Sequence, residues 1–186
     1  FESCGIPHRI DDRRLLWETG MGHAFLRALE GVLLDDADGV LAYLRSPYSG
    51  ISPEEVSDLD LRYRRGTGLG ARALVQIADD MGLGSLESLW TMVVADGTGG
   101  SRFDHEAARA VSRAMLAAGI GGAVAGSEET EEDARAFRAL DSALATVASL
   151  TPGERCEWLD ARLALRTLGQ ATVPGAGEDG DAVQVL

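Results

Sequence analysis

The chain has 186 residues, a length typical of one domain. Hydrophobic residues make up 45% of it and charged residues 25%, a composition that is ordinary for a globular protein. Its formal net charge of −13 disfavours a general nucleic-acid coat or a membrane-surface binder, because both need a cationic face, but allows a small local contact with DNA. The two cysteines, Cys4 and Cys156, are too few for a disulfide framework or a zinc site, and no apolar run reaches the roughly 18 residues of a membrane span. We therefore expect a cytoplasmic protein with reduced thiols and no membrane partner.

The spacing of apolar residues predicts a mainly helical chain with one strand near each end. The first strand is expected at residues 6–10 and the last at 183–186. Between them, the predicted helices cover residues 19–33, 37–44, 52–64, 71–81, 85–95, 103–118, 130–150 and 151–168. Because the chain begins with Phe1 and ends on the strand-like "DAVQVL", we expect a piece of a longer protein.

Helix-capping patterns support several of these boundaries. Ser52 is a good N-cap, Pro53 suits the first helical position, and Glu55 completes a capping box three residues after the serine. The "DDAD" run at 35–38 lacks the glycine and the distal glutamate of a calcium loop, so it is better interpreted as a helix cap. Thr130 is expected to cap a helix with an acidic first turn, and the acidic run at 128–133 is expected to be a solvated face.

The usual catalytic patterns do not assemble in this sequence. "HEAAR" begins like a zinc-protease motif, but Arg109 stands where the second histidine would follow His105. The sequence contains no G-x-S-x-G nucleophile elbow. Three tryptophans at helical spacing among apolar residues are expected to pack in the core: Trp17, Trp90 and Trp158. We therefore assign no catalytic, cofactor-binding or metal-binding residue to this chain.

The stretch "RRGTGLGARAL", residues 64–74, is the strongest candidate site. Its glycines are close to a dinucleotide fingerprint, but that motif must follow a strand, and here an arginine-rich helix precedes it. Glycines before a helix N-terminus let backbone N–H groups approach a phosphate. Residues 62–72 contain four arginines, Arg62, Arg64, Arg65 and Arg72, and no acidic residue. The alternative is a flexible hinge with solvated arginines.

Several phrases in chain order resemble the UvrD/Rep and RecB/AddAB superfamily 1 DNA helicases. "GIPHRI" followed by "LLWETGMGHAFLRALEGVL" resembles a strand and helix of the second motor domain, just before its 2B insertion. "VLAYLRSPYSGIS" is similar to a phrase of the RecB/AddAB branch, and "GTGLGARALVQIADDMGLGSLESLW" to the family's GIG turn and the helix after it. "DAVQVL" resembles the strand that leads into the next helicase motif.

This resemblance implies a mainly α fold: a helical 2B-type insertion domain with short terminal β-strands that belong to a RecA-like α/β motor domain. The implied divisions are a motor-domain stub at 1–34, a helical accessory domain at 35–178 and a returning motor strand at 179–186. The parent would be a bacterial ATP-dependent DNA helicase or helicase-nuclease of repair or recombination, with ATP and Mg bound outside this chain. Its partners would be duplex or tailed DNA, the rest of the helicase and a helicase-nuclease subunit.

The family's GIG turn contacts duplex DNA, so the resemblance assigns DNA-backbone contacts to Gly68, Leu69, Gly70, Ala71 and Arg72. Arg64 and Arg65 join them as flanking cations, although the family often has an arginine directly before the turn, where this chain has Thr67. The rival hypothesis is an acidic helical scaffold, like an inactivated AddB-type subunit, that docks a partner protein without contacting DNA. A free-standing enzyme is disfavoured by the missing catalytic patterns.

Overall fold

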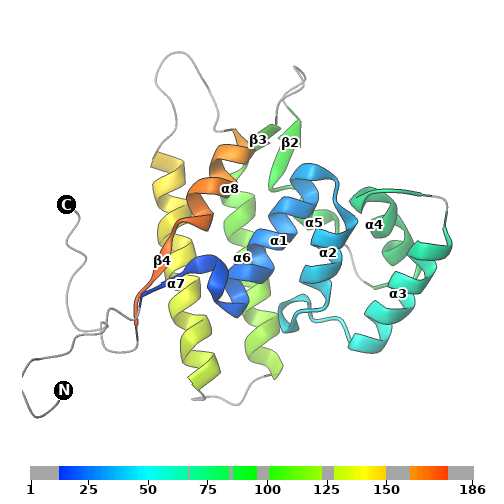
Figure 1. Cartoon of the computed structure of the whole chain (residues 1–186), viewed down its shortest axis with the longest axis horizontal. Coiled ribbons are helices and arrows are strands. Elements are labelled where there is room, and N and C mark those ends of the chain that lie inside the picture. Colours follow the sequence, from blue (N-terminus) through cyan, green and yellow to red (C-terminus); the bar gives the residue numbers. More distant parts are fainter. Residues whose placement is uncertain are drawn as a thin grey trace, which may run out of the picture.

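A computed structural model describes residues 13–66, 68–83, 86–95, 101–122, 128–149 and 160–175. The strands predicted at 6–10 and 183–186, and Trp158, lie outside these residues. The described chain is mainly helical, as the apolar spacing predicts (Figure 1).

Eight α-helices, two 3-10 turns and four short strands make up the described part of the chain. The α-helices are α1 (Gly20–Leu34), α2 (Ala37–Leu44), α3 (Pro53–Arg65), α4 (Ala71–Asp80), α5 (Glu87–Trp90), α6 (His105–Gly122), α7 (Glu128–Ser149) and α8 (Ala161–Gly169). The 3-10 turns are η2 (Leu16–Glu18) and η3 (Pro47–Ser49). The strands are β1 (Arg14–Leu15), β2 (Val93–Ala95), β3 (Ser101–Phe103) and β4 (Thr172–Val173).

Helix α1 is the centre of the core. It packs against α2 on one side and against α6, α7 and α8 on the other, so it separates the two halves seen in Figure 1. Met21, Phe25 and Leu29 are fully buried on this helix, because apolar residues recur at a helical spacing. The N-cap Thr19 accepts a hydrogen bond from the Gly22 amide.

Helices α1 and α2 approach each other closely through glycine. A Cβ on Gly39 would lie 2.9 Å from Gly31 Cα, so no larger residue fits there without displacing a helix. The expected division between residues 34 and 35 falls between these two helices, which share one core. The assignment of residues 1–34 to a motor domain stays a prediction.

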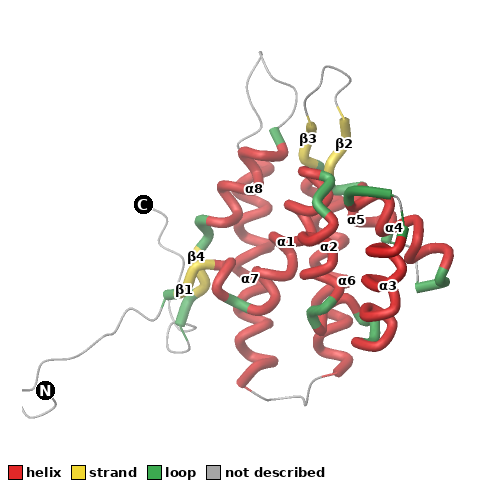
Figure 2. Tube along the Cα trace, turned by 45° about the vertical axis from the view of Figure 1, so that its right-hand side comes forward, coloured by secondary structure: helices red, strands yellow, loops and turns green. Residues whose placement is uncertain are grey.

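The first and last described segments meet in a two-stranded antiparallel sheet. Strand β1 pairs with β4 in the register Arg14 to Val173 and Leu15 to Thr172. The Leu16 amide extends the contact by donating to the Ala171 carbonyl at 2.7 Å. The chain therefore enters and leaves the helical body at the same place, as Figure 2 shows.

Three predictions about local structure are wrong, and the first two concern the helix at 85–95 and Trp17. The helix predicted at 85–95 is only the short α5, and residues 93–95 form β2, which pairs with β3. Adjacent Val93 and Val94 favour a strand, and the strand pairing overrides the helical spacing. Trp17 is half exposed and not a core residue, whereas Trp90 packs partly buried against the core.

The acidic start of α7 is also more than a solvated face. The helix begins at Glu128, so Thr130 lies inside its first turn and the predicted cap is wrong. Asp133 is half-buried and accepts a hydrogen bond from the Tyr48 hydroxyl of η3 at 2.5 Å. Burial raises the pKa of both groups above their ordinary values. The ring of Tyr48 fits because Gly119 has no side chain; a Cβ there would lie 2.7 Å from Tyr48 Cδ1.

Candidate nucleic-acid interface

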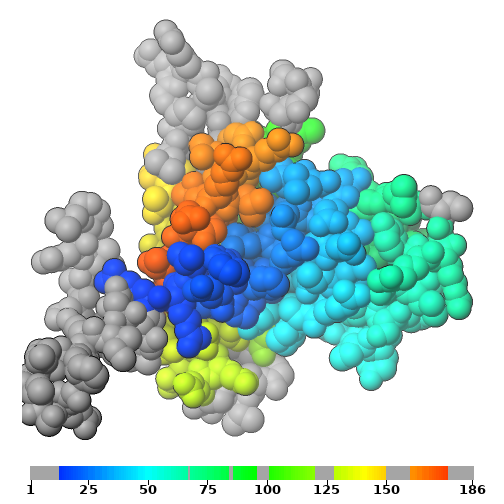
Figure 3. Space-filling model, in the orientation of Figure 1, coloured from blue at the N-terminus to red at the C-terminus, as the bar shows by residue number. Residues whose placement is uncertain are grey.

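The candidate residues lie at the end of α3, at the start of α4 and in the connection between these helices, which we call the α3–α4 turn, at one end of the molecule. Figure 3 shows these two helices, cyan to green, at the opposite end from α7 and α8. Gly68 and Leu69 lie at the surface of the turn, and the Leu69 side chain is 88% exposed. A leucine this exposed does not stabilise the fold by burial, so it is available for contact with another molecule.

Glycine at position 70 is required by the backbone. Its φ of 87° and ψ of 171° lie in a region that only glycine adopts readily. Space is also lacking, since a Cβ would lie 2.4 Å from Asp35 Oδ2. The Gly70 amide donates to the Tyr63 hydroxyl at 3.1 Å, which ties the turn to the last part of α3. The turn is therefore a fixed connection at this point, and the hinge interpretation loses its main support.

The N-terminus of α4 is capped from another part of the chain. The Ala71 amide donates to the Asp35 carbonyl at 3.1 Å, and the Arg72 amide donates to Asp35 Oδ1 at 3.0 Å. Asp35 follows α1 in the left-handed conformation, with φ of 52°. Aspartate tolerates that conformation better than most residues, because its short side chain bonds locally. The negative charge that a helix start attracts is thus already supplied by Asp35.

The neighbouring Asp36 caps α2 by accepting from the amides of Asp38 and Gly39. The interpretation of "DDAD" as a helix cap is therefore confirmed. The sequence does not reveal that Asp35, the first residue of this run, caps a second helix. The hydrogen bond from the Arg72 amide to Asp35 spans 37 positions of the chain.

Two of the four arginines are neutralised. Arg62 pairs with Asp58 at 3.1 Å, and Arg64 Nε lies 2.8 Å from Asp60 Oδ1, each one helical turn earlier on α3. Asp60 also pairs with Arg45 at 2.9 Å. The hydrogen bond from Arg64 holds the pKa of Asp60 below its ordinary value, so this carboxylate stays charged. The sequence range 62–72 leaves out Asp58 and Asp60, so a charge counted over that range overstates the positive charge of the turn.

Arg65 and Arg72 are the cations that remain. Both are exposed, and neither forms an ion pair with any residue in the described part of the chain. They flank the turn on its two sides, Arg65 at the end of α3 and Arg72 in the first turn of α4. With Leu69 between them in sequence, they offer two guanidinium groups and one apolar tip to a partner.

This arrangement narrows what the turn can do. Since Asp35 occupies the amides of residues 71 and 72, Ala71 and the backbone of Arg72 are not open to an anion in this structure. Phosphate contacts would come from the side chains of Arg65 and Arg72, with Gly68 and Leu69 allowing close approach. Arg64 would act only by leaving Asp60. Sequence reasoning missed two positioning residues, Asp35 and Tyr63.

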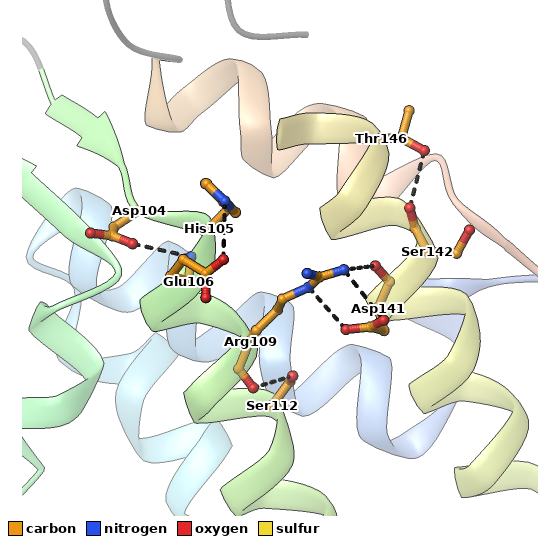
Figure 4. Close-up of polar contacts among 8 residues, drawn as sticks. All are labelled: Asp104, His105, Glu106, Arg109, Ser112, Asp141, Ser142 and Thr146. Atoms are coloured by element: carbon orange, nitrogen blue, oxygen red, sulfur yellow. Dashed lines mark hydrogen bonds and ion pairs between the residues drawn. The ribbon is translucent and has the colours of Figure 1, made fainter. Parts of the chain in front are cut away.

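The "HEAAR" segment forms a structural contact instead of a reactive site. Asp104 caps α6 through the amides of Glu106 and Ala107, and Arg109 reaches across to α7 (Figure 4). Arg109 Nε lies 3.0 Å from Asp141 Oδ1, an ion-pair distance, although it is turned away from good hydrogen-bond geometry. The residue that breaks the zinc-protease spacing therefore links two helices.

Among the residues that the structure describes, no three His, Cys, Asp or Glu side chains converge into a group that could hold a metal ion. Within the same residues, no helix is both long enough and apolar enough to span a bilayer. Comparison with known proteins gives no match, since no family model fits the sequence and neither a curated protein nor a solved structure is significantly similar.

Proposed function

We propose that this chain is a DNA-contacting accessory region of a helicase-like protein, and that the α3–α4 turn meets the duplex backbone. One observation carries the proposal: on an otherwise acidic protein, exposed Leu69 lies in sequence between Arg65 and Arg72, two exposed arginines that form no ion pair with the described residues. Guanidinium groups bind phosphates well, and two of them on a fixed turn can grip adjacent phosphates without reading bases.

The course of the chain supports an insertion. Because β1 pairs with β4, the helical body begins and ends at one point, which is what insertion into another domain requires. In this proposal the flanking segments belong to a RecA-like motor domain of a UvrD/Rep–RecB/AddAB-like helicase. The parent binds ATP and Mg there and uses hydrolysis to separate strands in repair or recombination. The described region orients duplex DNA for that motor.

The test is fluorescence anisotropy of the chain with a 3′-tailed duplex at about 50 and 200 mM salt. Two phosphate contacts predict a slope of log affinity against log salt of about −2, so affinity falls about tenfold over this range. A binding curve with no salt dependence, or no binding at the lower salt concentration, contradicts the proposal.

The acidic scaffold is the second candidate. The pairing of Arg62 and Arg64 with α3 carboxylates favours it, because this pairing halves the charge that the turn presents. A scaffold that docks a partner subunit would leave DNA unbound at both salt concentrations. The same titration therefore separates the two functions.

A further inference from the structure

A groove runs between α7 and the α8–β4 segment, at the opposite end of the molecule from the α3–α4 turn. Its volume is about 430 Å³, within the range of ligand-binding clefts. Ala139 and Ala143 of α7 line one wall, and Ala171 lines the other. These small side chains leave room between the two segments for a chain with small apolar groups.

The groove has a charge opposite to that of the molecule. Arg135 and Arg138 line it, and none of the described residues along it is acidic, although the chain carries a net charge of −13. Arg135 forms no ion pair with the residues that the structure describes. These two arginines lie one turn apart on α7, so both can serve the same end of the groove. This end is complementary to a carboxylate.

Strand β4 adds an unused backbone edge beside the groove. The Leu16 amide donates to Ala171, which makes Leu15 and Thr172 the non-hydrogen-bonded pair of the β1–β4 ladder. The N–H and C=O of Thr172 therefore point away from β1. Thr172 itself lines the groove, and within the described residues its N–H and C=O have no hydrogen-bond partner.

We propose that this groove binds an extended segment of a partner protein with acidic residues at one end and small aliphatic residues after them. The segment adds to the free edge of β4 through Thr172, and a carboxylate at its acidic end meets Arg135. The groove wall from Arg135 to Thr146 is about 16 Å long along the helix axis, which corresponds to about five extended residues. This site is independent of the DNA contact, because it shares no residue with the turn.

The proposal is tested on the whole chain with fluorescein-labelled hexapeptides of Val and Thr that carry Asp-Asp at either end. Anisotropy should show binding of an Asp-Asp peptide and at least tenfold weaker binding of the same peptide with Lys-Lys. Because the molecule is strongly acidic, its net charge alone predicts the reverse order. Equal binding of the two peptides, or no binding of either Asp-Asp peptide, overturns the proposal.

Two matched pairs of variants locate the peptide. Arg135→Glu should weaken binding about tenfold, and Arg113→Glu, an exposed arginine of α6 outside the groove, should leave it within about twofold. Ser142→Trp fills the groove and should abolish binding, whereas Ala145→Trp on the exposed face of α7 should not. Circular dichroism checks that each variant folds.

Hydrogen exchange reports the strand addition itself. Exchange of the Thr172 amide should slow when the peptide is bound, because the amide gains a hydrogen-bond partner. A peptide that binds and is sensitive to Arg135→Glu but leaves Thr172 exchange unchanged contradicts the β4 geometry. Binding of decanoate, with no binding of the peptides, would assign the groove to a small amphiphile instead.

Discussion

Helices α3 and α4 are consecutive in the chain, yet their N-termini are built in different ways. Helix α3 has a local cap: Ser52 accepts from the Glu55 amide, and Glu55 accepts from the Ser52 amide in return. Helix α4 begins at Ala71, its N-cap residue Gly70 has no side chain, and Asp35 caps the helix from the end of α1. A local cap determines at which residue a helix begins. A cap from a distant residue also fixes the position of the helix relative to the rest of the fold.

The distant cap fixes the position of the candidate site. Because Asp35 holds α4 and Tyr63 holds Gly70, the turn that carries Leu69 is attached to both α1 and α3. The same carboxylate places a negative charge next to Arg72. The turn thus gains a fixed position, and α4 loses an open anion site at its start.

The largest expected effect is that of Gly70→Ala. An alanine must adopt a positive φ and its Cβ must displace the Asp35 carboxylate, so we expect a loss of about 2–3 kcal/mol in the free energy of unfolding. Urea denaturation measures this loss. Gly82→Ala is the matched control, because Gly82 has φ of 73° but nothing within 4 Å of a Cβ. It should cost about 1 kcal/mol, and equal losses would show that the contact with Asp35 is unimportant.

Asp35→Ala should have the next largest effect, about 1–2 kcal/mol, because it removes the α4 cap and places alanine in the left-handed conformation. Asp35→Asn should restore most of this stability, since asparagine keeps an acceptor and tolerates the same φ. Thermal unfolding of the two variants provides the comparison. An Asp35→Ala protein as stable as the wild type would mean that α4 does not need its distant cap.

The Asp35→Asn variant also tests the proposed DNA contact. Asp35→Asn removes the negative charge beside Arg72 and keeps the hydrogen bond, so the duplex affinity should rise severalfold. An unchanged or lower affinity with normal stability would argue against phosphate contact by Arg72.

The local cap gives the smallest effects. Ser52→Ala should cost about 1 kcal/mol, less than Asp35→Ala, and should leave the α3–α4 turn in place. Hydrogen bonds from the backbone and then the side chain of Ser52 lower the pKa of Glu55 below 4.5. Because folding lowers the pKa of Glu55, the stability contributed by its ionised carboxylate is present above pH 4.5 and is lost as the pH falls through the pKa of Glu55 in the folded state. Carboxyl NMR titration of the wild-type protein should show the Glu55 pKa below 4.5, and a value at or above 4.5 would contradict the capping box.

The same contrast explains which features the sequence could predict. Local signals predicted the boundaries of α2, α3 and α4 to within one residue, because caps and apolar spacing act over one or two turns. The predicted helix at 85–95 failed because residues 93–95 pair with β3, the next strand along the chain, and a test for helical spacing does not register this pairing. The paired state of Arg62 and Arg64 was available in the sequence, since Asp58 and Asp60 lie four residues before them. The role of Asp35 could not be predicted from the sequence, because the amides that it caps belong to a helix far away in the chain.

Two double variants with equal changes in charge test whether the α3–α4 turn grips a duplex. Arg65→Ala with Arg72→Ala removes the unpaired arginines, and Arg62→Ala with Arg64→Ala removes the paired ones. At about 50 mM salt, we expect the first pair to lower the affinity for a 3′-tailed duplex about tenfold and the second less than threefold. Equal losses would show that only net charge matters, and no loss in either would contradict DNA contact at this turn.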